Sequence, residues 1–238
     1  MNDYDRLLAL IGSDAAGRVT SSERRAVAGD TVRRWTYDLM TGVLGGRVEV
    51  TPVRHPLGFL CFPVWRGGGR GVCVHVWTAG LRAQPTTSPM HAHSWDLLSA
   101  VLYGRVGNQI LDVTGATDRP THRIFEIHSA ADGDVVRATA QLVTSRTRST
   151  EHFHSGEVYT LPHGVFHVSD VPGEAATVVL GEARPGRPDR SLGGLATADH
   201  WVHRTACTTT ETRQAAETVL DHLSTLPEQL EDRCERAT

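Results

Sequence analysis

The sequence predicts an all-β domain, a small barrel or sandwich of the jelly-roll kind, with N-terminal and C-terminal helices packed outside it. About nine short apolar runs lie between residues 57 and 183, separated by glycine, proline or aspartate, and no helical pattern interrupts them. Helical periodicity occurs only before residue 46 and after residue 209. Evenly spaced short strands without intervening helices are typical of β-sandwiches and barrels.

The N-terminal part is expected to be helical. Thr20 and Glu23 have capping-box spacing, and apolar residues then recur at helical intervals up to Gly45 and Gly46, which end the pattern. This predicts a helix over residues 20–44, and a shorter one is expected over residues 3–11.

Strands are expected from residue 47 onward. The runs that alternate or are rich in β-branched residues cover 57–65, 72–77, 99–103, 108–113, 122–128, 135–143, 157–161, 165–168 and 177–183. Residues 184–200 are predicted to form an extended loop, and residues 210–226 a helix. Three regions follow from this: a helical extension over 1–46, a barrel over 47–185, and a C-terminal loop and helix over 186–238.

The composition is that of a soluble globular protein. The chain has 238 residues, 39% of them hydrophobic and 21% charged, with a formal net charge of -3. This balance does not favour a nucleic-acid or anionic-membrane partner. The start of the chain does not resemble a signal peptide and no apolar run approaches a spanning length, so a cytoplasmic location is expected.

The cysteines are scattered and form no CxxC pair. Their spacing argues against a thiolate zinc site or a disulfide framework. Cys61 and Cys73 lie in apolar runs, and we interpret them as reduced packing residues. The chain contains thirteen histidines, and histidine is the commonest metal ligand.

Two histidines stand two positions apart in the segment Pro89-Met90-His91-Ala92-His93. Residues at i and i+2 of a strand point to the same face, so both imidazoles can reach one ion. A second pair with this spacing, His152 and His154, is expected in a solvated loop.

A more specific pattern runs from Gly156 to His167. It consists of glycine, five residues, Pro162, one residue, Gly164, two residues and His167. The glycine and the Pro-x-Gly element favour a turn, after which a strand would carry His167 inward.

The two segments resemble the two signature motifs of the cupin superfamily over about residues 50–185. The second motif matches at each of its characteristic positions, and the first matches at His91, His93 and Gly104. The glutamate of the family's first motif would fall at position 97 or 98, and both are leucine. The resemblance therefore implies a three-histidine metal site made by His91, His93 and His167.

Asp96 stands too early for the missing glutamate. It is a candidate fourth ligand or a hydrogen-bond partner that orients a ligand histidine. A barrel that has lost its metal and keeps these histidines as polar pocket residues is the remaining alternative.

Three-histidine sites of this kind occur in the thiol-dioxygenase branch of cupins, and this resemblance favours Fe(II). Nickel, manganese, zinc or copper can occupy the same nitrogen ligands. The Ser-x-His-x-Tyr string of that branch is absent, and position 98 is leucine instead of cysteine, so cysteine-type substrates are not expected.

The residues expected to contact a small-molecule substrate are Gln109, Tyr159 and Glu182, since a pocket needs a few placed polar groups on an apolar lining. His75 and Trp77 alternate with Cys73 and would line the pocket if that strand face points inward.

The function that follows is a mononuclear metal-dependent enzyme, most plausibly a non-heme Fe(II) dioxygenase acting on a small polar metabolite. A metal-dependent isomerase, epimerase or lyase, and a non-catalytic binding cupin, remain as alternatives. By analogy with cupins, a homodimer is possible.

Overall fold

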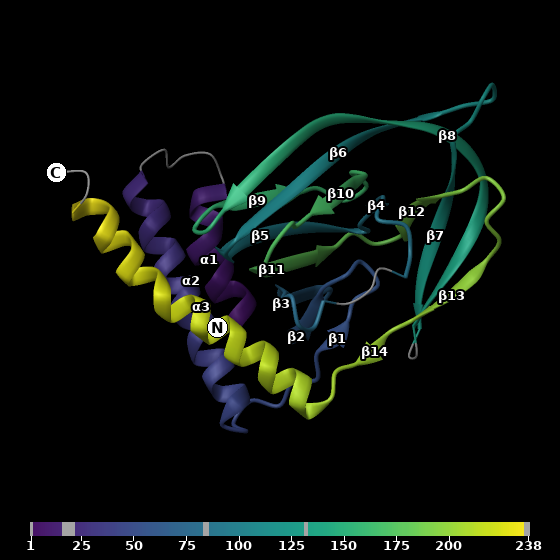
Figure 1. Ribbon diagram of the computed structural model, residues 1–238. Helices are drawn as coiled ribbons and strands as arrows, with labels where there is room; N and C mark the ends of the chain where they lie inside the picture. Colours follow the sequence, from purple (N-terminus) through teal and green to yellow (C-terminus); the bar gives the residue numbers. More distant parts are fainter. Residues whose placement is uncertain (1, 16–21, 83–85, 131–132, 236–238) are drawn as a thin grey trace.

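Two antiparallel sheets face each other, and the helices pack against the outer side of one of them (Figure 1). This architecture is seen in a computed structural model that describes residues 2–15, 22–82, 86–130 and 133–235. Side chains are described at 2–11, 29–82, 86–130 and 133–225. The predicted capping contact between Thr20 and Glu23 lies outside the described side chains. The predicted fold class, a β-sandwich or barrel with helices at both ends packed outside it, is confirmed.

The first sheet, called sheet A, carries the helices. In order across the sheet its strands are β14 (Thr205–Ala206), β1 (Val53–Arg54), β2 (Leu60–Gly67), β3 (Arg70–Trp77), β11 (Ala175–Ala183), β5 (Trp95–Tyr103) and β9 (Val158–Leu161). The helices are α1 (Asp3–Ala15), α2 (Ser22–Leu44) and α3 (Thr209–Glu235). All three lie where helical periodicity predicted them.

The second sheet, called sheet B, holds most of the residues of the candidate site. Its strand order is β13 (His200–His203), β8 (Gly133–His154), β6 (Arg105–Gly115), β10 (His167–Asp170), β4 (His91–Ala92), β12 (Asp189–Gly193) and β7 (His122–Ala130). The long strand β8 also pairs with β7, so it arches over the sheet from one side to the other (Figure 1).

Two sequence expectations were wrong in this region. Residues 184–200 were expected to form a loop, but β12 lies between β4 and β7 and the sheets continue to Ala206. His152 and His154 were expected in a loop, but they end strand β8, where their side chains are exposed. Both segments are polar, and it is pairing with distant strands that makes them extended.

Alternation along the strands of sheet A separates two cores. Val72, Val74 and Val76 point outward and pack with the helices, in a cluster that includes Leu7, Met40 and Val219. The residues between them, including His75 and Trp77, face sheet B. Phe59, Val101 and Val106 pack together across the two sheets, so the interior between the sheets is a second apolar core.

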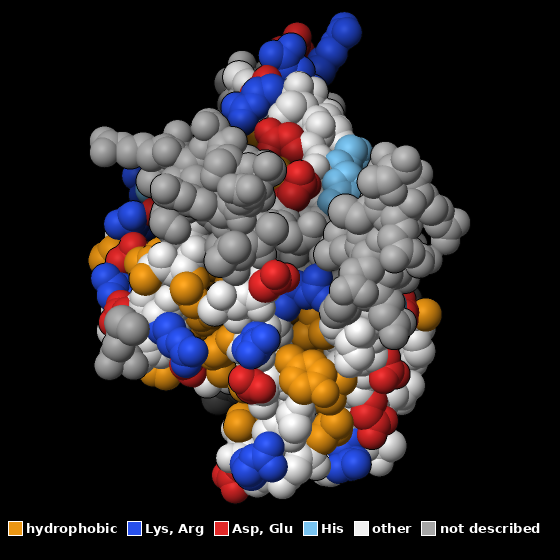
Figure 2. Space-filling view, turned by 90° about the vertical axis from the view of Figure 1, so that its left-hand side faces the viewer, with side chains coloured by type: hydrophobic (Ala, Val, Ile, Leu, Met, Phe, Trp, Pro, Cys, Tyr) orange, Lys and Arg blue, Asp and Glu red, His pale blue; other side chains and the backbone are white. Residues whose placement is uncertain are grey.

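Basic and acidic side chains are interspersed with hydrophobic ones on the helical face of the molecule (Figure 2). Among the described residues, none of the helices combines the length and the apolar character needed to span a membrane.

Candidate metal centre

His91, His93 and His167 come together inside the sandwich. His91 on β4 pairs directly with His167 on β10, and His93 follows β4 by one residue. The ring centroids of His91 and His167 are 4.2 Å apart, and those of His91 and His93 are 4.8 Å apart. One nitrogen from each ring lies within 4.8 Å of the others. We call these three residues the imidazole cluster.

A backbone hydrogen bond joins the two sequence motifs. The Gly164 amide donates to the His93 carbonyl oxygen at 2.8 Å, three residues before His167 begins its strand. Gly164 has a φ of 77°, a conformation that glycine adopts without the steric cost of a Cβ. The Pro-x-Gly turn therefore holds the start of β10 against the end of β4.

Two of the three imidazoles are oriented by backbone carbonyls. Nδ1 of His91 lies 2.9 Å from the Pro89 carbonyl oxygen, and Nδ1 of His167 lies 3.1 Å from that of Val165. A carbonyl oxygen can only accept, so each Nδ1 carries the proton. The lone pair is then on Nε2, the arrangement found in histidines that ligate metals through Nε2.

Burial keeps the cluster uncharged. Burial and the neighbouring His93 lower the pKa of His91 to about 3. Burial and His91 lower the pKa of His167 to about 3 in the same way. The pKa of His93 is also well below its usual range, mainly because of burial and then because of His167. Near neutral pH the cluster presents three neutral nitrogen donors. These donors carry no negative charge that would balance the charge of a bound metal ion.

This donor set fits a divalent metal ion. Around a tetrahedral ion with bonds of about 2.0–2.1 Å, ligand nitrogens are separated by about 3.4 Å, so small side-chain adjustments would complete the site. Three neutral ligands would leave the ion's charge uncompensated and at least one position open. The cluster could therefore hold an ion that also binds an anionic molecule.

Apolar residues from both sheets lie around the cluster. The Trp95 ring lies 4.3 Å from that of His93, and Ile110 is the cross-strand neighbour of His167. Ile110 belongs to a buried cluster with Leu97, and Tyr159 packs against it. These contacts restrict the rotamers of the imidazoles and limit water around them.

The Asp96 carboxylate bonds to His163 and Arg184, so the two predicted roles, fourth ligand and partner of a histidine of the imidazole cluster, are both wrong. Its Oδ1 accepts hydrogen bonds of 2.8 Å from the backbone N–H and from Nδ1 of His163, and its Oδ2 accepts from Arg184. Partial burial acts to raise the pKa of Asp96, but these hydrogen bonds outweigh it and lower the pKa to about 2. Asp96 pairs with Glu182 on the helix-facing side of sheet A, away from the interior.

The three residues expected to contact substrate are not brought together. Tyr159 faces the interior, opposite Ser99 on β5. Gln109 is flanked on β6 by inward-facing Asn108 and Ile110, so it points to the other side of sheet B. Glu182 contacts Arg70 at 3.3 Å on the outer side of sheet A. Strand alternation thus removes Gln109 and Glu182 from the imidazole cluster.

The polar surroundings of Tyr159 make it the remaining candidate. Burial raises the pKa of Tyr159, and the polar groups of Ser99 and Asn108 beside it oppose this shift. Ser99, Asn108 and Thr177 are buried, and each has a polar atom without a hydrogen-bond partner in the described part of the chain. Such atoms inside a sandwich mark a place where a polar ligand or water can be accommodated.

Sequence reasoning missed a second group of potential ligands. Cys61, Cys73 and His75 have ligand atoms that lie within 4.8 Å of one another. His55, for which the sequence offered no role, stacks on Phe59 at a centroid separation of 4.3 Å and acts on the pKa of His93 together with His75. No motif spacing marks these residues, because β1, β2 and β3 meet only in the folded sheet.

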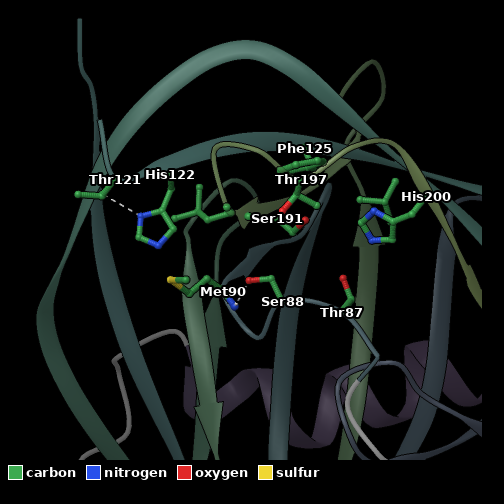
Figure 3. A pocket seen from close by; sticks show the side chains of 13 residues that line it. Thr87, Ser88, Met90, Thr121, His122, Phe125, Ser191, Thr197 and His200 are labelled. Atoms are coloured by element: carbon green, nitrogen blue, oxygen red, sulfur yellow. Dashed lines mark hydrogen bonds between the residues drawn. The ribbon is translucent and has the colours of Figure 1, made fainter. Parts of the chain in front are cut away.

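A cavity of about 350 Å³ lies along β4, β12 and β7, and none of the three imidazoles of the cluster lines it. Its lining includes Met90, which precedes His91, and Ser191, which pairs with His91 across β12 and β4. Figure 3 shows His122 and His200 on opposite sides of the cavity, with Phe125 and other residues between them. Its size is within the range of small-ligand pockets.

The fold and the imidazole cluster define a two-sheet β-sandwich with a candidate three-histidine metal centre. No protein-family model matches the chain, and no curated protein sequence matches it.

Several solved structures are remotely similar. A cupin superfamily protein from Desulfitobacterium hafniense is 9% identical, with a TM-score of 0.31, and the match covers 53% of this chain and 78% of that one. A hydroquinone 1,2-dioxygenase bound to Cd²⁺ and 4-hydroxybenzonitrile is 16% identical, with a TM-score of 0.32 and coverage of 52% and 63%. A hydroquinone 1,2-dioxygenase from Sphingomonas sp. TTNP3 is 14% identical, with a TM-score of 0.32 and coverage of 57% and 66%.

Proposed function

We propose that this protein is a mononuclear metal-dependent enzyme, a non-heme Fe(II) dioxygenase acting on a small polar metabolite. The observation that carries the proposal is the imidazole cluster: three buried, neutral imidazoles with ligand atoms within 4.8 Å. An iron(II) ion held there would supply open coordination positions for an anionic substrate and O₂. Nickel, manganese, zinc or copper are alternative occupants of the same nitrogens.

The chain's own residues supply orientation and electrostatics. Pro89 and Val165 accept from the Nδ1 protons of His91 and His167 and keep each ring in the tautomer that presents Nε2. Trp95 and Ile110 exclude water from one side of the cluster. Tyr159 contributes a neutral hydroxyl that can donate a hydrogen bond to a substrate oxygen, since burial raises its pKa.

We assign the cavity beside β4 as the place for the organic part of the substrate. Its lining combines hydroxyl groups and imidazoles with the apolar Phe125 and Leu192, which suits a small molecule with an apolar body and polar substituents. One lining residue, Ser191, is the cross-strand neighbour of His91.

The proposal is tested by oxygen uptake. The chain is purified without added metal, its metal content is measured, and the metal-free form is then loaded with Fe(II) under argon. Oxygen consumption is followed with a panel of small carboxylates, phenols and diols. The expected result is substrate-dependent uptake that is absent in His91→Ala and is reduced in Tyr159→Phe, with both variants folded by circular dichroism.

The other outcomes point to other functions. Turnover of a panel compound without oxygen uptake would replace the dioxygenase by metal-assisted isomerase, epimerase or lyase chemistry. Saturable binding without turnover would indicate a binding protein. A chain that binds no divalent ion at His91 would overturn the proposal entirely.

A further inference from the structure

Two cysteines and a histidine form a cluster on the inner face of sheet A. Cys61 on β2 pairs directly with His75 on β3, and Cys73 precedes His75 by two residues on the same strand. Directly opposed residues of antiparallel strands, and residues at i and i+2, point to the same face of a sheet. We call Cys61, Cys73 and His75 the thiol cluster.

The separations within the thiol cluster are those of a metal site that needs little adjustment. All three ligand atoms lie within 4.8 Å of one another. Around a tetrahedral zinc ion with Zn–S bonds of about 2.3 Å, two sulfurs lie about 3.8 Å apart, so closure by about 1 Å or less is needed. Rotation of the cysteine side chains can supply this without moving the strands.

The surroundings of the cluster are apolar on one side. Cys61 is buried, and the Phe59 ring lies 4.3 Å from that of His75. Trp77 meets His75 edge to face at 6.1 Å. The Cys61 thiol and the nearby His75 lower the pKa of Cys73 well below its usual value despite burial.

We propose that Cys61, Cys73 and His75 form a second metal site, which takes a thiophilic divalent ion, zinc above all. Two thiolates and one imidazole are soft and borderline ligands that suit Zn²⁺. Binding breaks two S–H bonds and releases the two protons to solvent, and two thiolates then neutralise the ion. A neutral complex is the form that can be accommodated beside Phe59 and Trp77.

The two clusters differ in what they would bind. The imidazole cluster has no anionic ligand, so a bound ion keeps its charge for an exogenous anion. The thiol cluster cancels that charge itself, and three protein ligands leave one position for water. This second site does not depend on the proposed dioxygenase activity.

Cobalt(II) provides the test, because thiolate coordination gives it a near-ultraviolet charge-transfer absorption that imidazole coordination lacks. The reduced full-length chain is stripped with a chelator and titrated with Co²⁺, and Zn²⁺ is then added. The expected result is two bound ions per chain and a charge-transfer band that zinc abolishes. His91→Ala should keep the charge-transfer band and bind one ion per chain instead of two.

The cysteine variants complete the design. Cys61→Ser and Cys73→Ser should each lose the band and keep the other ion, and His75→Gln should weaken Co²⁺ binding at the thiol cluster by more than about tenfold. Cys207→Ser is the matched control, because Cys207 is also a buried free cysteine but stands outside the cluster, and it should keep the band.

The wild-type titration decides the proposal even if a cysteine variant does not fold. Absence of the charge-transfer band in the reduced wild-type chain would overturn it. So would a band that persists in the double variant Cys61→Ser, Cys73→Ser, since the thiolate would then come from elsewhere.

Discussion

The imidazole cluster and the thiol cluster are held in place in different ways. His91 and His167 are each tied by Nδ1 to a backbone carbonyl, and the Gly164 amide fastens their two segments together. The thiol cluster lies on a single hairpin, where the side chains of Cys61 and Cys73 interact with each other and that of Cys73 also interacts with His75. The first is oriented by backbone groups around it, whereas the second is oriented by register between two neighbouring strands.

The imidazole cluster is therefore preorganised for a metal ion, whereas the thiol cluster would be ordered by the ion that it binds. Backbone carbonyls fix the tautomer of an imidazole whether or not a metal is present, so the first cluster is preorganised. The thiol cluster is oriented by strand register and by contacts among its own side chains, and an ion would have to order them further. We therefore expect the imidazole cluster to be the more sensitive to changes outside its ligands.

The largest effect is expected from removing a ligand of the imidazole cluster. His167→Ala should weaken metal binding there by more than about 100-fold, because a ligand contributes more than the orienting groups whose loss costs about 10–100-fold. Isothermal titration calorimetry of the metal-free chain measures this loss of metal affinity. His154→Ala is the control, since His154 belongs to the exposed His-x-His pair. Equal affinities in the two variants would contradict the site.

The pH dependence of the free energy of unfolding should reflect the lowered pKa values in the imidazole cluster. His91 and His167 have pKa values of about 3 in the folded chain against 6.5 when unfolded. Between these values the unfolded chain binds protons that the folded chain does not. The stability of the metal-free chain should therefore be complete above pH 6.5 and fall as the pH drops toward 3, with a slope of up to about 1.4 kcal/mol per pH unit for each histidine.

Urea unfolding at a series of pH values measures this slope. His167→Gln should flatten it, because one of the depressed groups is removed. A free energy of unfolding that is constant across the window would show that these imidazoles are not buried in the metal-free chain.

Gly164 tests whether the turn positions the site. Gly164 and Gly186 have φ values of 77° and 78°, and a Cβ at either would meet nothing within 4 Å. Substitution by alanine should cost each about 1–2 kcal/mol of stability. Only Gly164→Ala should also weaken metal binding, because only that amide bonds to His93. Equal metal affinity in both variants would show that the turn does not orient the cluster.

The smallest effect is expected at Asp96. Asp96→Asn weakens the contacts with His163 and Arg184 at a half-exposed position, so the loss of stability should stay below about 1 kcal/mol. Metal affinity should be unchanged. A tenfold or larger loss of affinity would restore Asp96 as a partner of the site.

Local residue patterns predicted the helices and most strands, and the resemblance to the two cupin motifs implied the three histidines of the imidazole cluster. Pro162, Gly164 and His167 carry enough local constraint to predict a turn followed by an inward-facing histidine, since turn chemistry and strand alternation act over a few residues. The strand formed by 189–193 could not be predicted this way. Its residues carry no strong strand pattern, and pairing with β4 and β7 makes them extended.

The sequence by itself determined which residues have the chemistry for a metal centre: the imidazoles of His91, His93 and His167 in their two motifs. Only the tertiary structure decided which other polar groups reach the interior. In the folded chain Gln109 and Glu182 point away from the interior between the sheets, and Asp96 bonds to His163. Cys61 lies next to His75. The reason is that a side chain's face depends on the register of strands distant in sequence, and a change of one residue in that register reverses it.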